Sequence, residues 1–278
     1  MPVSTQNVAT LDFSKPLIMG ILNVTPDSFS DGGQFTQRNN AFKYALQMLG
    51  EGADIIDIGG ESTRPNAAPV AEQEELDRVI PAIESIRRES DALISIDTSK
   101  ARVMREAIAA GANIINDVLA LRGEDAIAAA AELDVPVCLM HMQGEPHSMQ
   151  ADPQYCDVVV EVKAFLQDRI DACLKAGIGK KNIWIDPGFG FGKTVIHNLT
   201  LLHHLKDFQA LGVPILAGLS RKSMIATLLN NAPIEERLPA SLALAVMAVQ
   251  SGANIIRVHD VKATVDALTM WQAVNEIA

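Results

Sequence analysis

Residues that could bind a flat, hydrogen-bonding molecule stand where apolar runs of this chain end. The runs LISID, NIIN and IWID close on Asp97, Asn116 and Asp186, and PILAGLS is followed closely by Lys222. Carboxylates and amides at the ends of buried segments are costly unless they meet a polar ligand. The three acceptors suit ring N–H and amino groups, and Lys222 suits a ring carbonyl or nitrogen. Alternatively, Lys222 and Asp186 could form only an internal salt bridge.

A second set of side chains, drawn from the two ends of the chain, could bind an anion. The first apolar run ends on Asn23, and the last, NIIRVHD, carries Arg257 and His259 on either side of Val258, so both face one side of a strand. If the two runs are neighbours, an amide, a guanidinium and an imidazole meet, and Arg suits phosphate oxygens. Asn23 could also give one oxygen to a Mg²⁺ ion held mainly by a diphosphate and water. Taken singly, Asn23 could be a turn residue and His259 an interior histidine.

The glycine-rich segment GFGFGKT at 188–194 is not a phosphate-binding P-loop. A P-loop has glycine at the position that Pro187 occupies here, and the spacing G-x-G-x-x-G is also absent. We interpret the segment as a tight loop over the mouth of the site. Phe189 or Phe191 could cover a flat ring there, although core packing is equally consistent with either aromatic.

The elements that must position these residues follow a repeating pattern. Apolar runs of β-branched and aliphatic residues alternate with helix-patterned sequence, as expected for parallel strands buried on both faces. Gly-Ala-Asp/Asn precedes an Ile-Ile run at 52–56, 111–115 and 252–256. Polar groups at the carboxyl ends of such strands are typical of a barrel active site. The pattern predicts an α/β fold, a single (β/α)₈ TIM barrel, and an open doubly wound sheet is the alternative.

Helices are expected between the strands, with Ser99 and Asp260 as N-caps of the helices that follow them. Residues 1–16 are expected to form an N-terminal extension that covers the bottom of the barrel, and 17–278 the barrel itself. Polar loops at 25–35 and 59–70 follow strands at the active face and are expected to act as lids. The predicted helices are 39–50, 71–89, 100–110, 124–133, 156–176, 197–209, 221–230, 236–251 and 261–275.

Composition narrows the class of protein further. The chain has 278 residues, 48% of them hydrophobic, and a net charge of −11, which argues against a general nucleic-acid or anionic-membrane surface. Three widely spaced cysteines match no metal-ligand pattern and favour a reducing, cytoplasmic compartment. No signal peptide and no membrane-spanning run is expected. The apolar segment 241–249 could be a barrel helix or part of a subunit interface.

The motifs together resemble those of the dihydropteroate synthases in the pterin-binding barrel family. The resemblance covers nearly the whole chain and follows the family's order. LNVTPDSFSDGG and GGESTRP are its most specific segments. The matching segments are MGILNVTPDSFSDGG (19–33), DIGGESTRP (57–65), INDV (115–118), DPGFGFGK (186–193), LSRKS (219–223) and IIRVHD (255–260).

The resemblance assigns roles to individual positions. It implies that Asp97, Asn116, Asp186 and Lys222 bind the pterin and that Asn23, Arg257 and His259 bind the diphosphate, with Asn23 the contact to Mg²⁺. It also implies catalytic roles for Lys222, Asp97, Arg257 and His259. The positions that it places beside the aminobenzoate are Thr63, Arg64, Pro65 and Ser220, and those that line the ring slot are Met140, Phe191 and Gly218.

The activity that the resemblance implies is a transferase step of folate biosynthesis. It joins 6-hydroxymethyl-7,8-dihydropterin diphosphate to 4-aminobenzoate and releases 7,8-dihydropteroate and diphosphate. It also implies a sulfonamide target and a homodimer. Departure of diphosphate to leave a pterin-stabilised cation, followed by attack of the amine, needs no covalent enzyme nucleophile.

Three other functions are compatible with parts of the pattern. A barrel that transfers a methyl group from methyltetrahydrofolate would share the pterin pocket but would not need Arg257 and His259. A catalytically silent barrel could serve as a binding subunit, although such chains usually lose charged site residues. A Schiff-base aldolase could use Lys222, and borohydride trapping with a carbonyl substrate would detect it.

Overall fold

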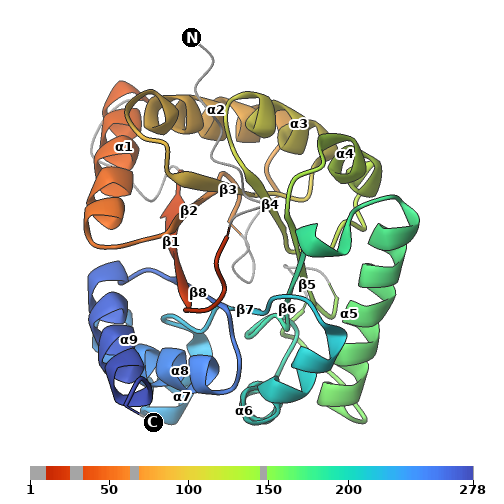
Figure 1. Ribbon diagram of the computed structural model, residues 1–278, viewed down its shortest axis with the longest axis vertical. Coiled ribbons are helices and arrows are strands. Elements are labelled where there is room, and N and C mark those ends of the chain that lie inside the picture. Colours follow the sequence, from red (N-terminus) through yellow and green to blue (C-terminus); the bar gives the residue numbers. More distant parts are fainter. Residues whose placement is uncertain (1–10, 26–33, 63–68, 145–148, 278) are drawn as a thin grey trace.

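The computed structural model describes residues 11–25, 34–62, 69–144 and 149–277, and its strands form one parallel sheet. The sheet within these residues is eight-stranded, in the order β6-β5-β4-β3-β2-β1-β8-β7. Each strand is followed by at least one helix, and Figure 1 shows the helices on the outside of the ring of strands. The strands are β1 (Leu17–Asn23), β2 (Ile55–Gly59), β3 (Leu93–Asp97), β4 (Ile114–Asp117), β5 (Val137–Met140), β6 (Ile183–Asp186), β7 (Leu216–Ala217) and β8 (Ile255–Val258).

The sheet closes into a barrel between its two edge strands. A parallel bridge joins Ile185 of β6 to Ile215, which immediately precedes β7. The first and last strands are neighbours, with Met19 opposite Arg257 and Gly20 opposite Val258. The prediction of a (β/α)₈ TIM barrel is therefore confirmed, and the open doubly wound alternative is wrong because both edges of such a sheet would stay unpaired.

The helices surround this barrel and bury its outer face. The α-helices are α1 (Gln34–Gly50), α2 (Glu72–Glu89), α3 (Ala101–Ala109), α4 (Ala126–Leu133), α5 (Val158–Lys175), α6 (Val195–His203), α7 (Ser223–Leu228), α8 (Leu238–Gln250) and α9 (Val261–Asn275). Short 3₁₀ helices are η3 (Lys180–Asn182), η4 (Leu205–Leu211) and η5 (Ile234–Glu236). None of the helices in the described part of the chain is long and apolar enough to cross a membrane.

The inner face of the barrel changes character from bottom to top. Near the amino ends of the strands, buried apolar side chains form an interior cluster separate from the core beneath the helices. Side chains two residues further along a strand share its face, so the next inner layers hold the polar residues of the strand ends. Phe13 extends the floor, with its ring 5.8 Å from that of Trp184 and nearly perpendicular to it. The interior cluster consists of Leu17, Met19, Ile55, Leu93, Ile114, Cys138, Trp184, Leu216 and Ile255.

Several helix boundaries differ from the predicted ones for local reasons. Helix α1 begins at Gln34 rather than at 39, and the intervening sequence contains no glycine or proline to prevent this. Thr194 starts α6 through a capping box with His197, and this helix ends at His203 before η4 continues the chain. Helix α7 begins only at Ser223 because Arg221 adopts a positive φ of 57°.

Of the two predicted N-caps, Ser99 is wrong, and Asp260 occupies the N-cap position without a side-chain cap bond. The N-cap residue of α3 is Lys100, without a side-chain cap bond, and the Ser99 hydroxyl instead donates to the buried carboxylate of Asp117. Asp260 does stand at the start of α9, but its side chain makes no cap bond. Its carboxylate oxygens accept from Arg221 at 2.9 and 2.5 Å. In both places, a charged or buried partner competes more strongly than the helix N–H groups do.

Candidate active site

A network of charged side chains lies on the inner face of the barrel, toward the carboxyl ends of β2, β3, β4 and β8. The Arg257 guanidinium donates through Nε to Asp57 Oδ2 at 2.6 Å and through Nη2 to Asp97 Oδ2 at 2.8 Å. Asn116 Nδ2 donates to the same Asp57 oxygen at 3.2 Å. Residues of four strands are thereby joined around one guanidinium.

Burial and charge shift the proton affinities within this network. Burial raises the pKa of Asp97 to about 7; Arg257 counteracts this shift, and the nearby Asp57 carboxylate adds to it. Burial disfavours the charged form of Arg257, but the two carboxylates outweigh this and raise the pKa of the guanidinium. Arg257 therefore stays charged at every physiological pH, whereas Asp97 changes charge close to neutrality.

Asp186 and Lys222 face the same mouth from β6 and from the segment after β7. Asp186 Oδ1 accepts from Gly188 N at 2.7 Å, and burial raises the pKa of this carboxyl. Lys222 Nζ lies 4.2 Å from the centre of the Phe191 ring, a cation–π contact. Burial lowers the pKa of Lys222 to about 8, although the nearby Asp186 carboxylate acts in the opposite direction and favours the charged ammonium. Among the described residues the two form no salt bridge within 4.0 Å, so a purely internal salt bridge does not account for them.

The structure resolves which aromatic residue can cover a ring. Phe189 is only 1% exposed and belongs to the core beneath the helices. Phe191 is half-buried and packs with Met140, Met142 and Met149 near the mouth. Phe191 is therefore the residue available to a bound heterocycle, as the resemblance implied, and Met140 contributes to the same apolar wall.

The open hydrogen-bonding groups define what the pocket can bind. Asp97 Oδ1, Asn116 Oδ1 and Asp186 Oδ2 accept no hydrogen bond from any residue that the structure describes, and none is fully enclosed. Lys222 Nζ donates no hydrogen bond within the same part of the chain. Three acceptors, one cationic donor and an apolar wall suit a flat heterocycle that carries several N–H groups and a carbonyl.

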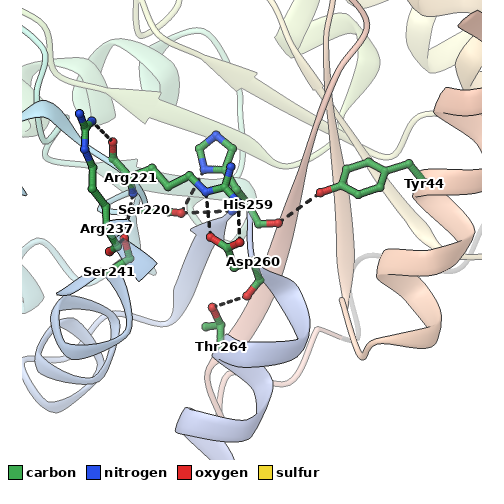
Figure 2. A network of polar contacts seen from close by, with 8 residues as sticks. All are labelled: Tyr44, Ser220, Arg221, Arg237, Ser241, His259, Asp260 and Thr264. Carbon is green, nitrogen blue, oxygen red and sulfur yellow. Dashed lines mark hydrogen bonds and ion pairs between the residues drawn. The ribbon is translucent and has the colours of Figure 1, made fainter. Parts of the chain in front are cut away.

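His259 and Ser220 form a polar pair at the neighbouring ends of β8 and β7. Ser220 Oγ lies 3.0 Å from His259 Nδ1 and accepts from His259 N at 3.3 Å, so its own proton is available to the ring nitrogen (Figure 2). Burial, followed by the charge of Arg257, lowers the pKa of His259 to about 3. The ring is therefore neutral, and a hydrogen bond accepted at Nδ1 makes Nε2 the protonated nitrogen, a donor suited to an anion.

The segment that carries Ser220 and Lys222 is fixed through the residue between them. Arg221 holds a positive φ of 57°, which is unfavourable for a side chain with a Cβ. Its N–H donates to Ser241 Oγ at 3.0 Å, and its carbonyl accepts from Arg237 at 3.1 Å (Figure 2). Together with the paired Asp260, these contacts from the starts of α8 and α9 hold the turn.

The remaining predicted site residues are placed as follows. Asn23 lies further along β1 than the position opposite Arg257, next to Gly59. A Cβ on Gly59 would lie 3.6 Å from Asn23 Oδ1 and equally close to Asp97 Cβ, so the amide faces the carboxylate across this glycine. Gly218 lies beside Arg257. Thr63, Arg64 and Pro65, like most of the two predicted lid loops, lie outside the described residues.

Asp57 is the functional candidate to which the sequence assigned no role. It is fully buried, and its Oδ1 has no hydrogen-bond partner among the described residues. It stands in the middle of DIIDIGG rather than at the end of an apolar run. The sequence signal that could have indicated a role for Asp57 is a carboxylate flanked by isoleucines within an apolar run. The structure shows that every residue of this strand is buried, so the charge needs a partner.

Comparisons with known proteins identify the class to which this barrel and its polar pocket belong. The sequence pattern described as pterin binding enzyme matches residues 19–259. The chain belongs to the pterin binding enzyme family.

Within that family, the chain is similar to dihydropteroate synthases over nearly its full length. It is 57% identical over 267 residues to the enzyme of Haemophilus influenzae, covering 96% of this chain and 97% of the relative. The Escherichia coli K12 enzyme is 54% identical, covering 95% of this chain and 93% of the relative.

Solved structures show the same similarity in three dimensions. The Yersinia pestis dihydropteroate synthase, solved as a sulfonamide drug complex, superimposes with a TM-score of 0.91 at 52% identity and covers 96% of each chain. The Xanthomonas albilineans dihydropteroate synthase with 4-aminobenzoic acid also has a TM-score of 0.91, at 53% identity over 95% of each chain.

Proposed function

We propose that this protein catalyses the dihydropteroate synthase reaction, a transferase step. It condenses 6-hydroxymethyl-7,8-dihydropterin diphosphate with 4-aminobenzoate and forms 7,8-dihydropteroate and diphosphate, a step toward folate. Sequence identity of 52–57% with dihydropteroate synthases over nearly the whole chain supports this activity. The observation that carries it in the structure is the convergence of open acceptors on Asp97, Asn116 and Asp186 with the Lys222 ammonium at one barrel mouth.

The pocket suits the reduced pterin in both its ground state and its reactive state. Asp97, Asn116 and Asp186 would accept from the ring N–H and amino groups, and Lys222 would donate to a ring carbonyl or nitrogen. When the bond between the methylene carbon and the diphosphate oxygen breaks, its electron pair leaves with the diphosphate. The positive charge that remains spreads into the pterin, where buried carboxylates stabilise it in a medium of low dielectric constant.

The departing diphosphate would be bound at the seam between β1 and β8. Arg257 keeps Nη1 free of hydrogen bonds to the described residues, and neutral His259 offers Nε2–H. These donors would stabilise charge that grows on the leaving group. Arg257 would thus connect the two halves of the site, because it also holds Asp57 and Asp97.

A magnesium ion would fit this seam if the diphosphate supplies most of its ligands. Asn23 offers a neutral amide oxygen beside Asp97. The described residues contain no group of three or more His, Cys, Asp or Glu side chains able to hold a metal by themselves. Mg²⁺ usually keeps several waters and binds through substrate phosphates with few protein ligands. The ion would neutralise phosphate charge when bound.

The second substrate completes the reaction as a nucleophile. The neutral aromatic amine of 4-aminobenzoate attacks the methylene carbon, a C–N bond forms, and the nitrogen then loses a proton to water. Ser220 and residues 63–65 are the proposed contacts of the aminobenzoate. Because the Yersinia pestis enzyme was solved with a sulfonamide drug, we infer that sulfonamides compete for the same place here.

Three helices present an apolar surface that supports a homodimer. Six large apolar side chains on or next to α7, α8 and α9 are 44–66% exposed, and these three helices are neighbours in Figure 1. An apolar interaction surface between two copies of the chain would bury these side chains. Sedimentation of Met247→Glu against the wild-type chain tests it. The surface consists of Leu228, Leu229, Ile234, Met247, Met270 and Val274.

The cysteines bear on location. Cys138, Cys156 and Cys173 are all free thiols. Cysteines usually stay free in proteins of reducing compartments. We propose a cytoplasmic location. Fractionation of cells that produce a tagged chain tests it.

The activity is tested with purified protein, the pterin diphosphate, 4-aminobenzoate and Mg²⁺. Dihydropteroate and diphosphate are both measured, and the expected ratio is one to one. Product should form only when both substrates are present. Diphosphate release without 4-aminobenzoate at the full rate would show a hydrolase instead, and no release at all would contradict the proposal.

A further inference from the structure

Lys193 is a buried cation that the proposed mechanism does not use. It directly follows residues 187–192, here called the glycine loop, which lead from β6 toward α6 and include Phe191. Its side chain is 3% exposed. Nζ lies 2.9 Å from each of three acceptors: the Gly188 carbonyl oxygen, the Phe191 carbonyl oxygen and His141 Nδ1. The first two belong to the glycine loop, and His141 follows β5.

The three contacts fit a protonated lysine. An ammonium group has three N–H donors and no acceptor; three acceptors lie at equal distance from it, and the His141 carbonyl oxygen lies further away at 3.3 Å. Burial, together with the Lys193 charge, lowers the pKa of His141 to about 2, so the ring is neutral and Nδ1 can accept. Burial also lowers the pKa of Lys193, to about 7, while Asp186 favours the charged form. Such a costly cation needs its full set of acceptors to remain charged.

The glycine loop depends on such contacts because its backbone is unusual. Gly188, Gly190 and Gly192 all have positive φ, at 72°, 81° and 59°. The loop contains no regular secondary structure, and its one internal backbone hydrogen bond runs from Phe191 N to the Gly188 carbonyl at 3.1 Å, so its other carbonyl groups depend on partners outside the loop. Tyr155 donates to the Gly192 carbonyl at 2.8 Å, whereas Lys193 holds the two carbonyls on either side of Phe189 and Gly190.

The contacts of Lys193 also bear on the proposed pterin pocket, because Phe191 belongs to the glycine loop. The backbone of Phe191 is held by Lys193, and its ring carries the Lys222 ammonium at 4.2 Å. Asp186, a second residue of the proposed pterin site, also contacts the glycine loop, because its carboxylate accepts from Gly188 N. We propose that Lys193 is a positioning residue of the pterin site, tying the glycine loop to His141 and thereby setting the places of Phe191, Asp186 and Lys222. This inference rests on the proposed function for its ligand.

Lys193→Met tests the inference, since Met keeps the length of the side chain but cannot donate. Lys175→Met is the matched control, because Lys175 is an exposed residue at the end of α5. We expect Lys193→Met to bind the pterin diphosphate at least tenfold more weakly, while the Michaelis constant for the aromatic amine changes less than threefold. We also expect amide hydrogen exchange in 188–192 to be at least tenfold faster, with strands β1 to β4 unchanged.

The outcomes separate the inference from the proposed function. Unchanged exchange in the glycine loop overturns the inference, as does faster exchange with unaltered pterin affinity, which would show a purely structural contact. If the wild-type chain binds no pterin diphosphate, the proposed function fails, and the pocket role of Lys193 fails with it even if exchange is faster. If Lys193→Met does not fold, His141→Phe removes a single acceptor and retains a ring. His141→Phe should raise the dissociation constant for the pterin diphosphate about threefold, and an unchanged dissociation constant would contradict the inference.

Discussion

Substitution of Asp57 and Arg257, singly and together, tests whether the charged network stabilises the folded protein. Arg257→Met removes hydrogen bonds of 2.6 and 2.8 Å and leaves the Asp57 and Asp97 carboxylates buried without their cation. Breaking a buried ion pair in this way costs about 3–5 kcal/mol of unfolding free energy. Asp57→Asn removes one charge-assisted bond but keeps an acceptor of the same shape, at a cost of about 2 kcal/mol.

The double variant should be less destabilised than the sum of the two single variants. In Arg257→Met, part of the cost comes from the uncompensated charge of Asp57, and Asp57→Asn removes that charge. The singles together predict a loss of about 6 kcal/mol, and we expect the double variant to lose about 4 kcal/mol. The resulting coupling energy is about 2 kcal/mol. The exposed pair Lys262 and Asp266, 2.5 Å apart on α9, is the control and should couple by only about 0.5 kcal/mol.

The assay is urea unfolding at pH 8, where Asp97 is ionised, followed by tryptophan fluorescence and far-UV circular dichroism. Coincident transitions would show that one free energy describes the unfolding. Additivity of Asp57→Asn and Arg257→Met within about 0.5 kcal/mol would refute the coupling and, with it, the role of Asp57 in the network.

Two further predictions follow from the strained loop and from the titrating carboxyl. Gly188→Ala should cost about 3 kcal/mol or more in urea unfolding, because φ is 72° and the new Cβ would lie 1.9 Å from the His141 carbonyl oxygen; Gly177→Ala, at φ 94° with open space, should cost only about 1–2 kcal/mol, and equal losses would contradict the clash. Burial raises the pKa of Asp97 to about 7, so its contribution to stability, complete below pH 3.8, is lost as pH rises through 7. Conversely, kcat/KM should fall below pH 7 as this carboxylate is protonated, and a pH profile with no such limb, or the same limb in Asp97→Asn, would exclude Asp97 as its source.

The architecture and most of the site could be predicted because both depend on strand ends. In a closed parallel barrel, residues at the carboxyl ends of strands converge whatever their separation in sequence. Asp97, Asn116 and Asp186 could therefore be grouped in advance, whereas Arg257 was expected with Asn23 and His259 and not as the partner of Asp97. Asp57 escaped this reasoning because it lies within a strand, flanked by isoleucines. Its importance depends on Arg257, which reaches it from β8 across the intervening β1.

Other details depend on competition between partners, which sequence spacing does not reveal. Ser99 and Asp260 have the residue types and positions of N-caps, yet Asp117 and Arg221 engage them instead. Phe189 and Phe191 are two residues apart in one loop, and only the packing against the helices distinguishes them. The sequence assigns no role to Lys193 once a P-loop is excluded, and its buried set of carbonyl acceptors becomes visible only in three dimensions.

The proposed pterin pocket is tested most directly by the affinity of Asp186→Asn for 6-hydroxymethyl-7,8-dihydropterin diphosphate, measured by titration calorimetry. Asparagine can still accept from Gly188 N, so the glycine loop should keep its conformation. Loss of the carboxylate should weaken binding about tenfold or more, as expected for a charged hydrogen bond worth about 1.5–3 kcal/mol. An unchanged dissociation constant would contradict the assignment of this barrel mouth to the pterin.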